Sequence, residues 1–413
     1  MKTEIRSLNE CLSLTIDRRG VTPKKLGSDW VSTGYPVLSA NNVKSTGLQK
    51  IEDIRYVDEK TYHKWMREEI QRGDILLTSE APAGEVYVWD SDDKIVVGQR
   101  LYALRVKDDI NPWFLAYYLQ SSKGQAEIAN KCSGSTVFGI SAKTFDHIEV
   151  VLPDRSIQDK VVEVLLNIDK KIKTNETLSS KLESIVRLFY NYWFVQFDFP
   201  DKNGRPYKSS GGKLVWNNEL KQKIPEDWET ERLGDLVEFK TDKVEPGNTK
   251  GLPYTPMDML PIKKMTFSNF RSDEEANSSL LSYQKNDILF GAMRPYFHRV
   301  CLAPFNGITR TTTFVLRASS DILGYAFETV DMDRTIAYAT AHSVGTQQPY
   351  AIWENGLADM LIAKPPIALK NDFSKRISVF IEMQYKLSIE NNKLSSLRDF
   401  LLPLLINGQV TFK

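Results

Sequence analysis

The clearest pattern along the chain is an apolar residue at every third or fourth position between residues 158 and 193, a stretch without Gly or Pro. Alternating steps of four and three residues place apolar side chains on one stripe of a helix, which is the seam of a coiled coil. The pattern therefore predicts one long central helix. Its seam consists of Val161, Leu165, Ile168, Ile172, Leu182, Val186, Phe189 and Trp193, interrupted by the polar residues Asn175 and Ser179.

A second helix with this pattern is predicted near the C-terminus, with seam residues Phe380, Met383, Leu387, Leu394, Leu397, Leu401 and Leu404. Glu390 stands in this series where Asn175 stands in the first. Each helix could pack only on its own domain, or the two could pack on each other, in which case polar residues at matching positions would set the register. We favour the second interpretation, with an interface formed by Leu165, Ile172, Leu182, Phe189, Trp193, Leu387, Leu394, Leu397 and Leu401.

The rest of the chain contains a repeat. Residues 71–78 (QRGDILLT) resemble residues 284–291 (QKNDILFG), and two further matches follow in the same order: 132–141 with 343–352, and the strands that end at Pro153 and Pro365. Three ordered matches at nearly constant spacing indicate two copies of one domain, which should superpose Asp74 on Asp287 and Gly134 on Gly345.

Each copy contains short β-rich runs separated by Pro, Gly, Asn and Asp, and then one helical stretch, which in the first copy is residues 111–131. The predicted fold class is therefore α+β, with two pseudo-repeated domains joined by two long antiparallel coiled-coil helices. The expected boundaries are 1–153 for the first domain, 154–198 for the central helix, 199–225 for a linker, 226–366 for the second domain and 367–413 for the distal helix. The linker is rich in Gly, Ser and basic residues, and its expected apolar anchors are Leu214, Val215 and Trp216.

Composition narrows the class of protein. The chain has 413 residues, is 41% hydrophobic, and has three widely spaced cysteines and no apolar run of membrane-spanning length. These features predict a cytoplasmic protein without a disulfide framework or a membrane association. The net charge of +1 argues against a protein that holds nucleic acid by bulk charge alone, so any DNA contact must be local.

Enzymatic chemistry is hard to find in the sequence. There is no phosphate-binding glycine motif, and the four histidines lack metal-ligand spacing, so we expect no catalytic residue, no metal site and no directly bound cofactor. Asp154, Asp169 and Lys171 could in principle form a nuclease-like metal site, but a solvated helix face explains them better.

Polar loops offer candidates for DNA contact, because Arg pairs bidentately with guanine, and Asn and Gln pair with adenine. Ordinary solvated loops remain the other interpretation of the same residues. The candidates in the first domain are Asn41, Asn42, Lys44, Arg100, Ser135 and Thr136. Those in the second domain are Arg294, Tyr296, Arg310, Thr312, Gln347 and Gln348.

Four segments resemble the specificity subunit of type I restriction-modification systems: SIQDKVVEVLLNIDKKI, YNYWFVQFDFP, GRPYKSSGGKLVWNNELKQKIPEDW and LRDFLLPLLINGQV. The resemblance implies two target-recognition domains that each read one half of a bipartite site in double-stranded DNA. It also implies a non-catalytic subunit that scaffolds two modification subunits and the restriction motor-nuclease subunits. Those partners would use S-adenosylmethionine, ATP and magnesium.

Two alternatives to a DNA-recognition subunit remain. One is a stand-alone methyltransferase-nuclease-like enzyme that uses Asp154, Asp169 and Lys171, and the other is a purely structural coiled-coil scaffold. A helix of about 40 residues is about 60 Å long. If the two helices pair antiparallel, we expect them to hold the half-sites about one turn of DNA apart, roughly 34–36 Å.

Overall fold

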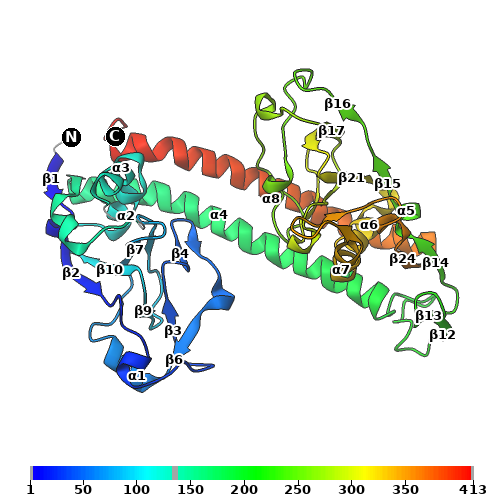
Figure 1. The fold of residues 1–413 in the computed structure, drawn as a ribbon, viewed down its shortest axis with the longest axis horizontal. Helices are drawn as coiled ribbons and strands as arrows, with labels where there is room; N and C mark the ends of the chain where they lie inside the picture. Colours follow the sequence, from blue (N-terminus) through cyan, green and yellow to red (C-terminus); the bar gives the residue numbers. More distant parts are fainter. Residues whose placement is uncertain (1–2, 133–137, 411–413) are drawn as a thin grey trace. The chain divides into compact units, whose positions relative to one another are not determined.

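The computed structural model describes residues 3–132 and 138–410 and divides into two compact units (Figure 1). Unit 1 comprises residues 1–170 and 395–413, and unit 2 comprises residues 171–394. The long central helix predicted from the heptad pattern is present as α4 (Arg155–Tyr190), which continues into a π-helical turn at Asn191–Val195. The second long helix is α8 (Ile367–Ile406).

Unit 1 is built on an antiparallel sheet with strand order β2-β10-β7-β8. A smaller sheet has the order β6-β3-β9, and two further pairs are β1–β11 and β4–β5. The strands are β1 (Thr3–Ser7), β2 (Leu12–Asp17), β3 (Tyr35–Leu38), β4 (Val43–Lys44), β5 (Gly47–Leu48), β6 (Arg55–Val57), β7 (Ile75–Thr78), β8 (Val86–Val88), β9 (Val96–Val97), β10 (Leu101–Val106) and β11 (Glu149–Pro153). The helices are α1 (Glu59–Trp65), α2 (Pro112–Gln120) and α3 (Ser122–Lys131).

The helical stretch of unit 1 begins where the sequence predicts but is broken once. Asn111 caps α2, because its side-chain oxygen accepts the backbone N–H of Trp113 at 3.0 Å, and Pro112 follows in the first turn. Ser121 then leaves the helical conformation and caps α3 by accepting from Gly124 N. The single predicted helix is therefore two helices, of which α2 packs on the main sheet and α3 adds Ile128 to the same core.

Unit 2 has a main antiparallel sheet of order β15-β21-β18-β19 and a three-stranded sheet of order β16-β17-β20. Its other pairs are β12–β13, β14–β24 and β22–β23. The strands are β12 (Leu214–Asn217), β13 (Gln222–Pro225), β14 (Glu229–Arg232), β15 (Glu238–Lys240), β16 (Lys243–Val244), β17 (Leu280–Tyr283), β18 (Ile288–Gly291), β19 (Val300–Leu302), β20 (Gly307–Arg310), β21 (Thr313–Arg317), β22 (Ser343–Val344), β23 (Tyr350–Ala351) and β24 (Leu361–Lys364). The helices are α5 (Leu233–Leu236), α6 (Leu323–Val330) and α7 (Asp333–Ala341).

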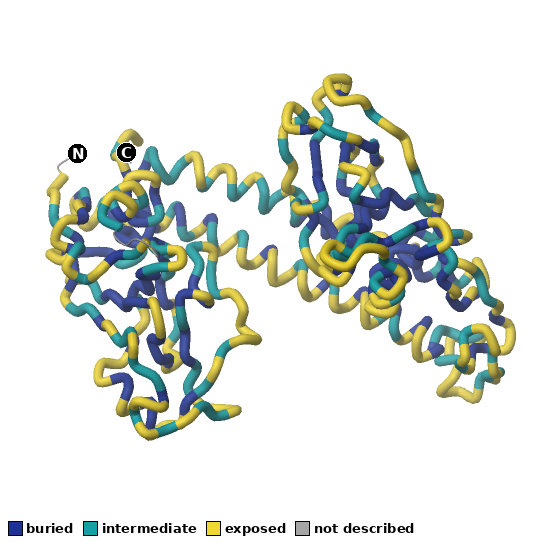
Figure 2. Tube along the Cα trace, in the orientation of Figure 1, coloured by how far each residue is buried: buried dark blue, intermediate teal, exposed yellow. Residues whose placement is uncertain are grey.

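Each unit has its own core, and in each the buried residues gather in the sheet and along one side of the helices (Figure 2). In unit 1 the main sheet packs with α2 and with Val161 and Leu165 of α4. In unit 2 the main sheet packs with Val186 of α4 and with Phe373 and Ile377 of α8. Alternating apolar residues in the strands and the seam residues of the helices therefore share one interior in each unit.

The predicted seam of α4 is buried along most of its length. Leu165, Leu182 and Trp193 are buried, whereas Ile172 and Phe189 are partly buried. The heptad pattern thus identified the buried face of this helix correctly.

Within unit 2, the two polar interruptions of the α4 seam contact α8. Asn175 Nδ2 donates to Glu390 Oε2 at 2.7 Å and to Asn391 Oδ1 at 2.8 Å. Ser179 Oγ donates to Gln384 Oε1 at 2.5 Å, and Gln384 Nε2 donates to the Ser179 carbonyl at 2.7 Å. Residue numbers rise along α4 as they fall along α8, so these helix segments are antiparallel. Asn175 and Glu390, the matching polar positions of the two sequence patterns, contact each other.

The seam prediction for α8 was partly wrong. Leu387 is buried and Leu394 and Leu401 are partly buried, but Leu397 is 45% exposed and Met383 is 43% exposed. The first half of α8 packs on the domain of unit 2 as well as on α4, and this widens and rotates its buried face. Gly324 of α6 allows that approach, because a Cβ atom there would lie 2.4 Å from Cδ1 of Ile377.

The expected linker contains a folded hairpin, β12–β13. Phe199 stacks on Tyr207 and on Trp228, and Asp198 accepts hydrogen bonds from the backbone and hydroxyl of Ser209. Trp216, which we expected to anchor the segment, is 60% exposed. Leu214 does pack against the core of unit 2, and aromatic residues at the ends of the stretch provide further contacts that its lack of apolar periodicity does not reveal.

We predict that Leu182→Asp lowers the stability of the chain by several kcal/mol, because it places an unpaired carboxylate in a buried position of α4. Leu397→Asp is the matched control on α8, and its exposed position should leave the melting temperature nearly unchanged. Thermal unfolding of both variants, monitored by circular dichroism, tests this expectation. Equal melting temperatures for the two variants would contradict the burial of α4 at Leu182.

Candidate nucleic-acid interface

In unit 2, three loops that carry predicted contact residues meet at one end of the main sheet. Ala292, just after β18, donates its N–H to the Thr312 carbonyl at 2.9 Å, and its own carbonyl accepts from Ala351 N at 2.8 Å. Arg294 N donates to the Pro349 carbonyl at 2.7 Å. These backbone contacts join residues 292–298, 311–313 and 345–351, which are far apart in the sequence.

The side chains at this end of unit 2 include several exposed groups suited to base contact. Tyr296 is 50% exposed, and Arg310, Gln347 and Gln348 are also exposed. Thr312 is partly buried, as is Arg294, whose Nε atom has no hydrogen-bond partner in the structure. The structure therefore places five of the candidates of unit 2 in these adjoining loops and Arg310 at the end of β20, directly before one of them.

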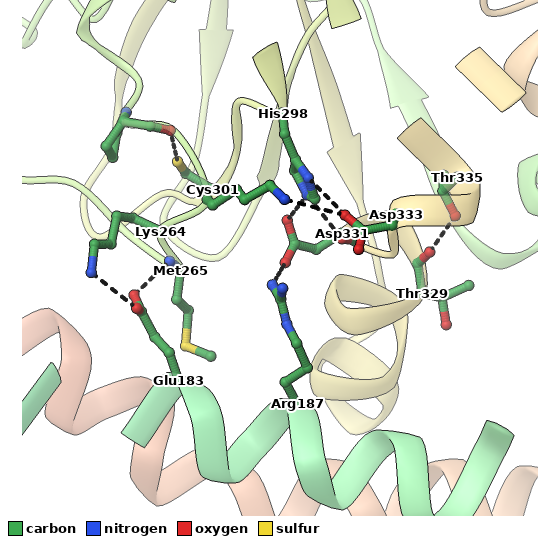
Figure 3. Close-up of polar contacts among 12 residues, drawn as sticks. Glu183, Arg187, Lys264, Met265, His298, Cys301, Thr329, Asp331, Asp333 and Thr335 are labelled. Atoms are coloured by element: carbon green, nitrogen blue, oxygen red, sulfur yellow. Dashed lines mark hydrogen bonds and ion pairs between the residues drawn. The ribbon is translucent and has the colours of Figure 1, made fainter. Parts of the chain in front are cut away.

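A cluster of polar contacts around the buried His298 and Asp331 fixes the loop after β18 (Figure 3). The side chain of His298 is 3% exposed, and its Nε2 atom lies 2.8 Å from Asp331 Oδ1. Arg187 of α4 donates to the other oxygen of Asp331 at 2.5 Å, and Asp333 Oδ1 lies 3.4 Å from His298 Nδ1. Within unit 2, the loop is thus tied through Asp331 to the central helix.

A second contact beside this cluster connects α4 to the same domain. Glu183 Oε1 accepts the backbone N–H of Met265 at 2.9 Å, and Glu183 Oε2 lies 3.3 Å from Lys264 Nζ (Figure 3). Glu328 is buried nearby, and burial raises the pKa of its carboxyl to about 8, with the charge of Asp331 as the next cause. The cluster therefore combines ion pairs with one carboxyl group that favours its neutral form.

In unit 1, loops at the corresponding end of the main sheet also converge. Ser79, just after β7, donates its N–H to the Arg100 carbonyl at 2.9 Å and accepts from Ile140 N at 2.8 Å. Ala40 N donates to the Gln99 carbonyl at 3.2 Å, which adds the loop around Asn41 to the group. Arg100 has a φ of 60°, is half exposed, and forms an ion pair with Glu80 at 2.9 Å.

Two candidates of unit 1 are engaged inside the protein. Asn42 is 4% exposed; its Oδ1 accepts from Ser39 N, and its Nδ2 donates to the Lys50 carbonyl at 3.2 Å. Its amide therefore shapes its own loop, and we withdraw it as a base contact. Lys44 is partly buried and forms an ion pair with Glu85 at 3.1 Å. Ser135 and Thr136 lie outside the described residues, as does Gly134.

A hollow beside Asn41 and Arg100 contains residues that the sequence search missed. Arg55 lies over the ring of Trp30, 3.9 Å from its centroid, and Gln99 lines the same hollow. Arg19 lines a second hollow that also includes Arg100. These residues come from separate strands and loops without a shared motif, so only folding brings them together.

The acidic residues considered for a nuclease site are not assembled as one. Asp169 accepts from Tyr117 Oη at 2.5 Å and from Arg398, while Asp154 precedes α4 by one residue. At 1.5 Å per residue, Asp154 and Asp169 are about 22 Å apart along the helix. In unit 2, Lys171 pairs with Glu390 at 3.3 Å. Among the described residues, no three His, Cys, Asp or Glu side chains gather as a metal ion would require.

Within residues 3–132 and 138–410, no helix combines the length and the apolar character that crossing a membrane requires.

Comparisons with known proteins point to one family. Residues 2–184 match the family model described as "Type I restriction modification DNA specificity domain". The chain is 25% identical over 370 residues to the type I restriction enzyme MjaIX specificity subunit of Methanocaldococcus jannaschii, covering 86% of this chain and 82% of the relative. It is 20% identical over 405 residues to the HindI specificity subunit of Haemophilus influenzae, covering 83% and 87% of the two chains.

The fold has a counterpart among solved structures. The crystal structure of the S subunit of a type I restriction-modification system from M. genitalium superposes with a TM-score of 0.60 at 14% identity. The match covers 98% of this chain and 96% of the other. At this identity, the similarity establishes a shared fold.

We predict that Glu328→Gln makes the chain more stable at pH 8 but not at pH 5. A carboxyl group whose pKa rises from 4.5 to about 8 on folding keeps a proton that the unfolded chain loses. Stability should therefore fall with rising pH in that window, by at most about 1.4 kcal/mol per pH unit. Melting temperatures measured between pH 5 and pH 8 should show a weaker pH dependence for the variant.

Glu176→Gln is the control, because Glu176 is exposed on α4 of the same unit. A Glu328→Gln variant with the same pH dependence as the wild type would show that Glu328 is ionised in the folded protein.

Proposed function

We propose a mode of action for this chain from the premise that it belongs to the specificity subunits of type I restriction-modification systems, which recognise DNA and are not themselves catalytic. In this proposal the chain carries two target-recognition domains, residues 1–153 and 226–366. Each reads one half of a bipartite site in double-stranded DNA. The convergence of loops at one sheet end in each unit is the observation that carries the proposal.

A repeated construction of the two domains is supported by a shared buried ion pair. Asp74, 2% exposed, accepts from Gln71 N and pairs bidentately with Arg105 at 2.8 and 2.9 Å. Asp287, 1% exposed, accepts from Gln284 N and pairs bidentately with Arg317 at 2.6 and 2.7 Å. The strands of the two main sheets also follow the same relative order, which is β2-β10-β7-β8 in unit 1 and β15-β21-β18-β19 in unit 2. We therefore treat the two domains as copies of one reader.

The proposed base contacts are the candidates from the sequence other than Asn42 and Lys44. Guanidinium groups pair bidentately with guanine and carboxamides with adenine, so side chains of both kinds at a groove edge can specify bases. Lys44 would have to leave Glu85 to reach a phosphate. The proposed set is Asn41, Arg100, Ser135 and Thr136 in the first reader, and Arg294, Tyr296, Arg310, Thr312, Gln347 and Gln348 in the second.

We further propose that residues 154–198 and 367–413 form an antiparallel coiled-coil spacer, with residues 199–225 as the connection between the halves. The contacts of Asn175 with Glu390 and of Ser179 with Gln384 support this pairing, because polar partners in a helix seam favour one register over its neighbours. A spacer of fixed register would hold the readers so that the half-sites lie about one turn of DNA apart, roughly 34–36 Å.

Type I specificity subunits assemble with modification and restriction subunits, and we propose that this chain carries two of the former. A row of apolar side chains on α4 and the turn after it faces solvent, and Leu188 alone is 66% exposed. Exposed apolar rows of this kind mark protein contacts. The row consists of Leu178, Ile185, Leu188, Tyr192 and Val195. S-adenosylmethionine, ATP and magnesium would be used by the partner subunits and not by this chain.

We predict that the two readers can be exchanged separately. Replacing residues 226–366 with the matching segment of a relative should change one half-site and preserve the other half-site and the spacer length. Methylome sequencing of cells carrying the exchanged subunit measures all three. A change in both half-sites would contradict the proposal of independent readers.

Single substitutions should act on one half-site only. Arg310→Ala or Gln347→Ala should relax specificity in the second half-site, at about 1–3 kcal/mol for each lost bidentate contact. Arg205→Ala is the control, because Arg205 is exposed but lies outside these loops and pairs with Asp201. Binding of the assembled methyltransferase to duplexes with single base changes gives the comparison. A loss of affinity that is equal for all sequences would assign Arg310 or Gln347 to phosphate contact instead.

A further inference from the structure

The turn between β18 and β19 in unit 2 has an unusual backbone. A short 3-10 segment, Pro295–Phe297, is flanked by Arg294 and His298, with φ values of 51° and 52°. Left-handed conformations are unfavourable for residues other than glycine, so two of them in one turn persist only where surrounding contacts impose them. Phe297 N donates to the Arg294 carbonyl at 2.9 Å, and His298 N donates to the Pro295 carbonyl at 2.8 Å.

Contacts on both sides hold this turn in place. On one side, the buried ring of His298 lies against Asp331, which also pairs with Arg187 of α4 (Figure 3). On the other side, Arg294 N donates to the Pro349 carbonyl in the loop that carries Gln347 and Gln348. The turn is therefore a braced element within the group of loops that we assign to the second reader.

The turn exposes a pair of aromatic rings, those of Tyr296 and Phe297, to solvent. Tyr296 is 50% exposed and Phe297 is 39% exposed, and their ring centroids are 4.9 Å apart at an interplanar angle of 59°. Burying aromatic rings in the core would be favourable, so their exposure on a fixed turn indicates a role in contact. Their place among the proposed DNA loops identifies double-stranded DNA as the occupant.

We propose that Tyr296 and Phe297 form a wedge that enters the stack of base pairs in the second half-site. Apolar side chains inserted at a base step unstack it and kink the duplex, and the cost depends on the sequence of that step. The wedge would thus add specificity through deformability, favouring flexible pyrimidine–purine steps, in addition to the hydrogen bonds of neighbouring loops. This inference rests on the proposed function.

The corresponding turn in unit 1, between β7 and β8, has no aromatic side chains. Between β7 and β8 the chain has Ala81, with a φ of 59°, followed by Pro82, Ala83 and Gly84. Its backbone also turns through a left-handed residue before a proline, but small side chains occupy the tip. The proposed distortion should therefore occur in one half-site only, and the other half-site supplies an internal control.

The test uses the complex of this chain with its modification subunits, bound to a duplex of its own target. 2-Aminopurine, whose fluorescence rises when it is unstacked, replaces single bases in either half-site, and the base that becomes methylated is left unchanged. We expect increased fluorescence at one step of the second half-site and none in the first. Tyr296→Ala and Phe297→Ala should each abolish the signal and weaken binding about tenfold, the usual scale for losing one aromatic–base stack.

Trp216→Ala is the matched control, because Trp216 is 60% exposed but lies on the hairpin β12–β13. It should retain both the signal and the affinity. If the wild-type complex methylates its site without a fluorescence change at any base step, the wedge proposal is wrong and the proposed function still holds. A complex that binds no bipartite site would instead overturn the proposed function. If the Tyr296 and Phe297 variants lose a partner subunit while keeping the signal, the turn is a protein contact and the wedge is wrong.

Discussion

The buried pairing of Asp287 with Arg317 is the contact on which the arrangement of the main sheet in unit 2, the proposed second reader, depends. Asp287 ends the turn before β18, and Arg317 ends β21, so the bidentate pair fixes the register of these two neighbouring strands. A slip of one residue would turn every side chain of a strand to the other face. The opposite ends of the same strands carry Ala292 and Thr312, and their contact brings the candidate reading loops together. Asp74 and Arg105 occupy the same place in unit 1.

The loops are therefore positioned by strands and helices whose residues are needed for packing. The exposed side chains of the loops are not needed for packing and can be replaced without changing the fold. In unit 2, the buried His298 and Asp331 connect the loop after β18 to Arg187 of the central helix. Removing His298 or Asp331 would leave a buried polar group without its partner, which is unfavourable. A framework of this kind can keep its geometry while the bases that it reads change with the loops.

The features that were predicted best from the sequence are those that depend on a regular spacing of apolar residues. The seam of α4 could be identified because each part of the helix buries its apolar stripe within its own unit, so Leu165, Leu182 and Trp193 are all buried. The first half of α8 contacts both α4 and the domain of unit 2, so a single stripe does not describe its buried face and Met383 was misplaced; Leu397, in the second half, is exposed as well. The hairpin β12–β13 was missed because aromatic residues at its ends, such as Phe199 and Trp228, hold it.

The candidate site was predicted less well, because residue type does not reveal what a side chain already binds. Asn42 has the right chemistry for adenine, but its amide is used within its loop. Gln99 and Arg55 join the hollow around Arg100 only after the strands have paired. In unit 2 the six candidates do lie close together, in or beside the converging loops, but their contact with bases stays a prediction.

The central claim is that two separate groups of loops each contact one half-site. Photo-crosslinking with 5-bromodeoxyuridine placed in either half-site, followed by mass spectrometry of the assembled methyltransferase, tests it most directly. The account predicts crosslinks from one half-site to residues 39–41, 99–100 and 138–141, and from the other to residues 293–297, 310–313 and 345–350. Crosslinks from a single half-site to both groups, or from either half-site mainly to the hairpin β12–β13, would contradict it.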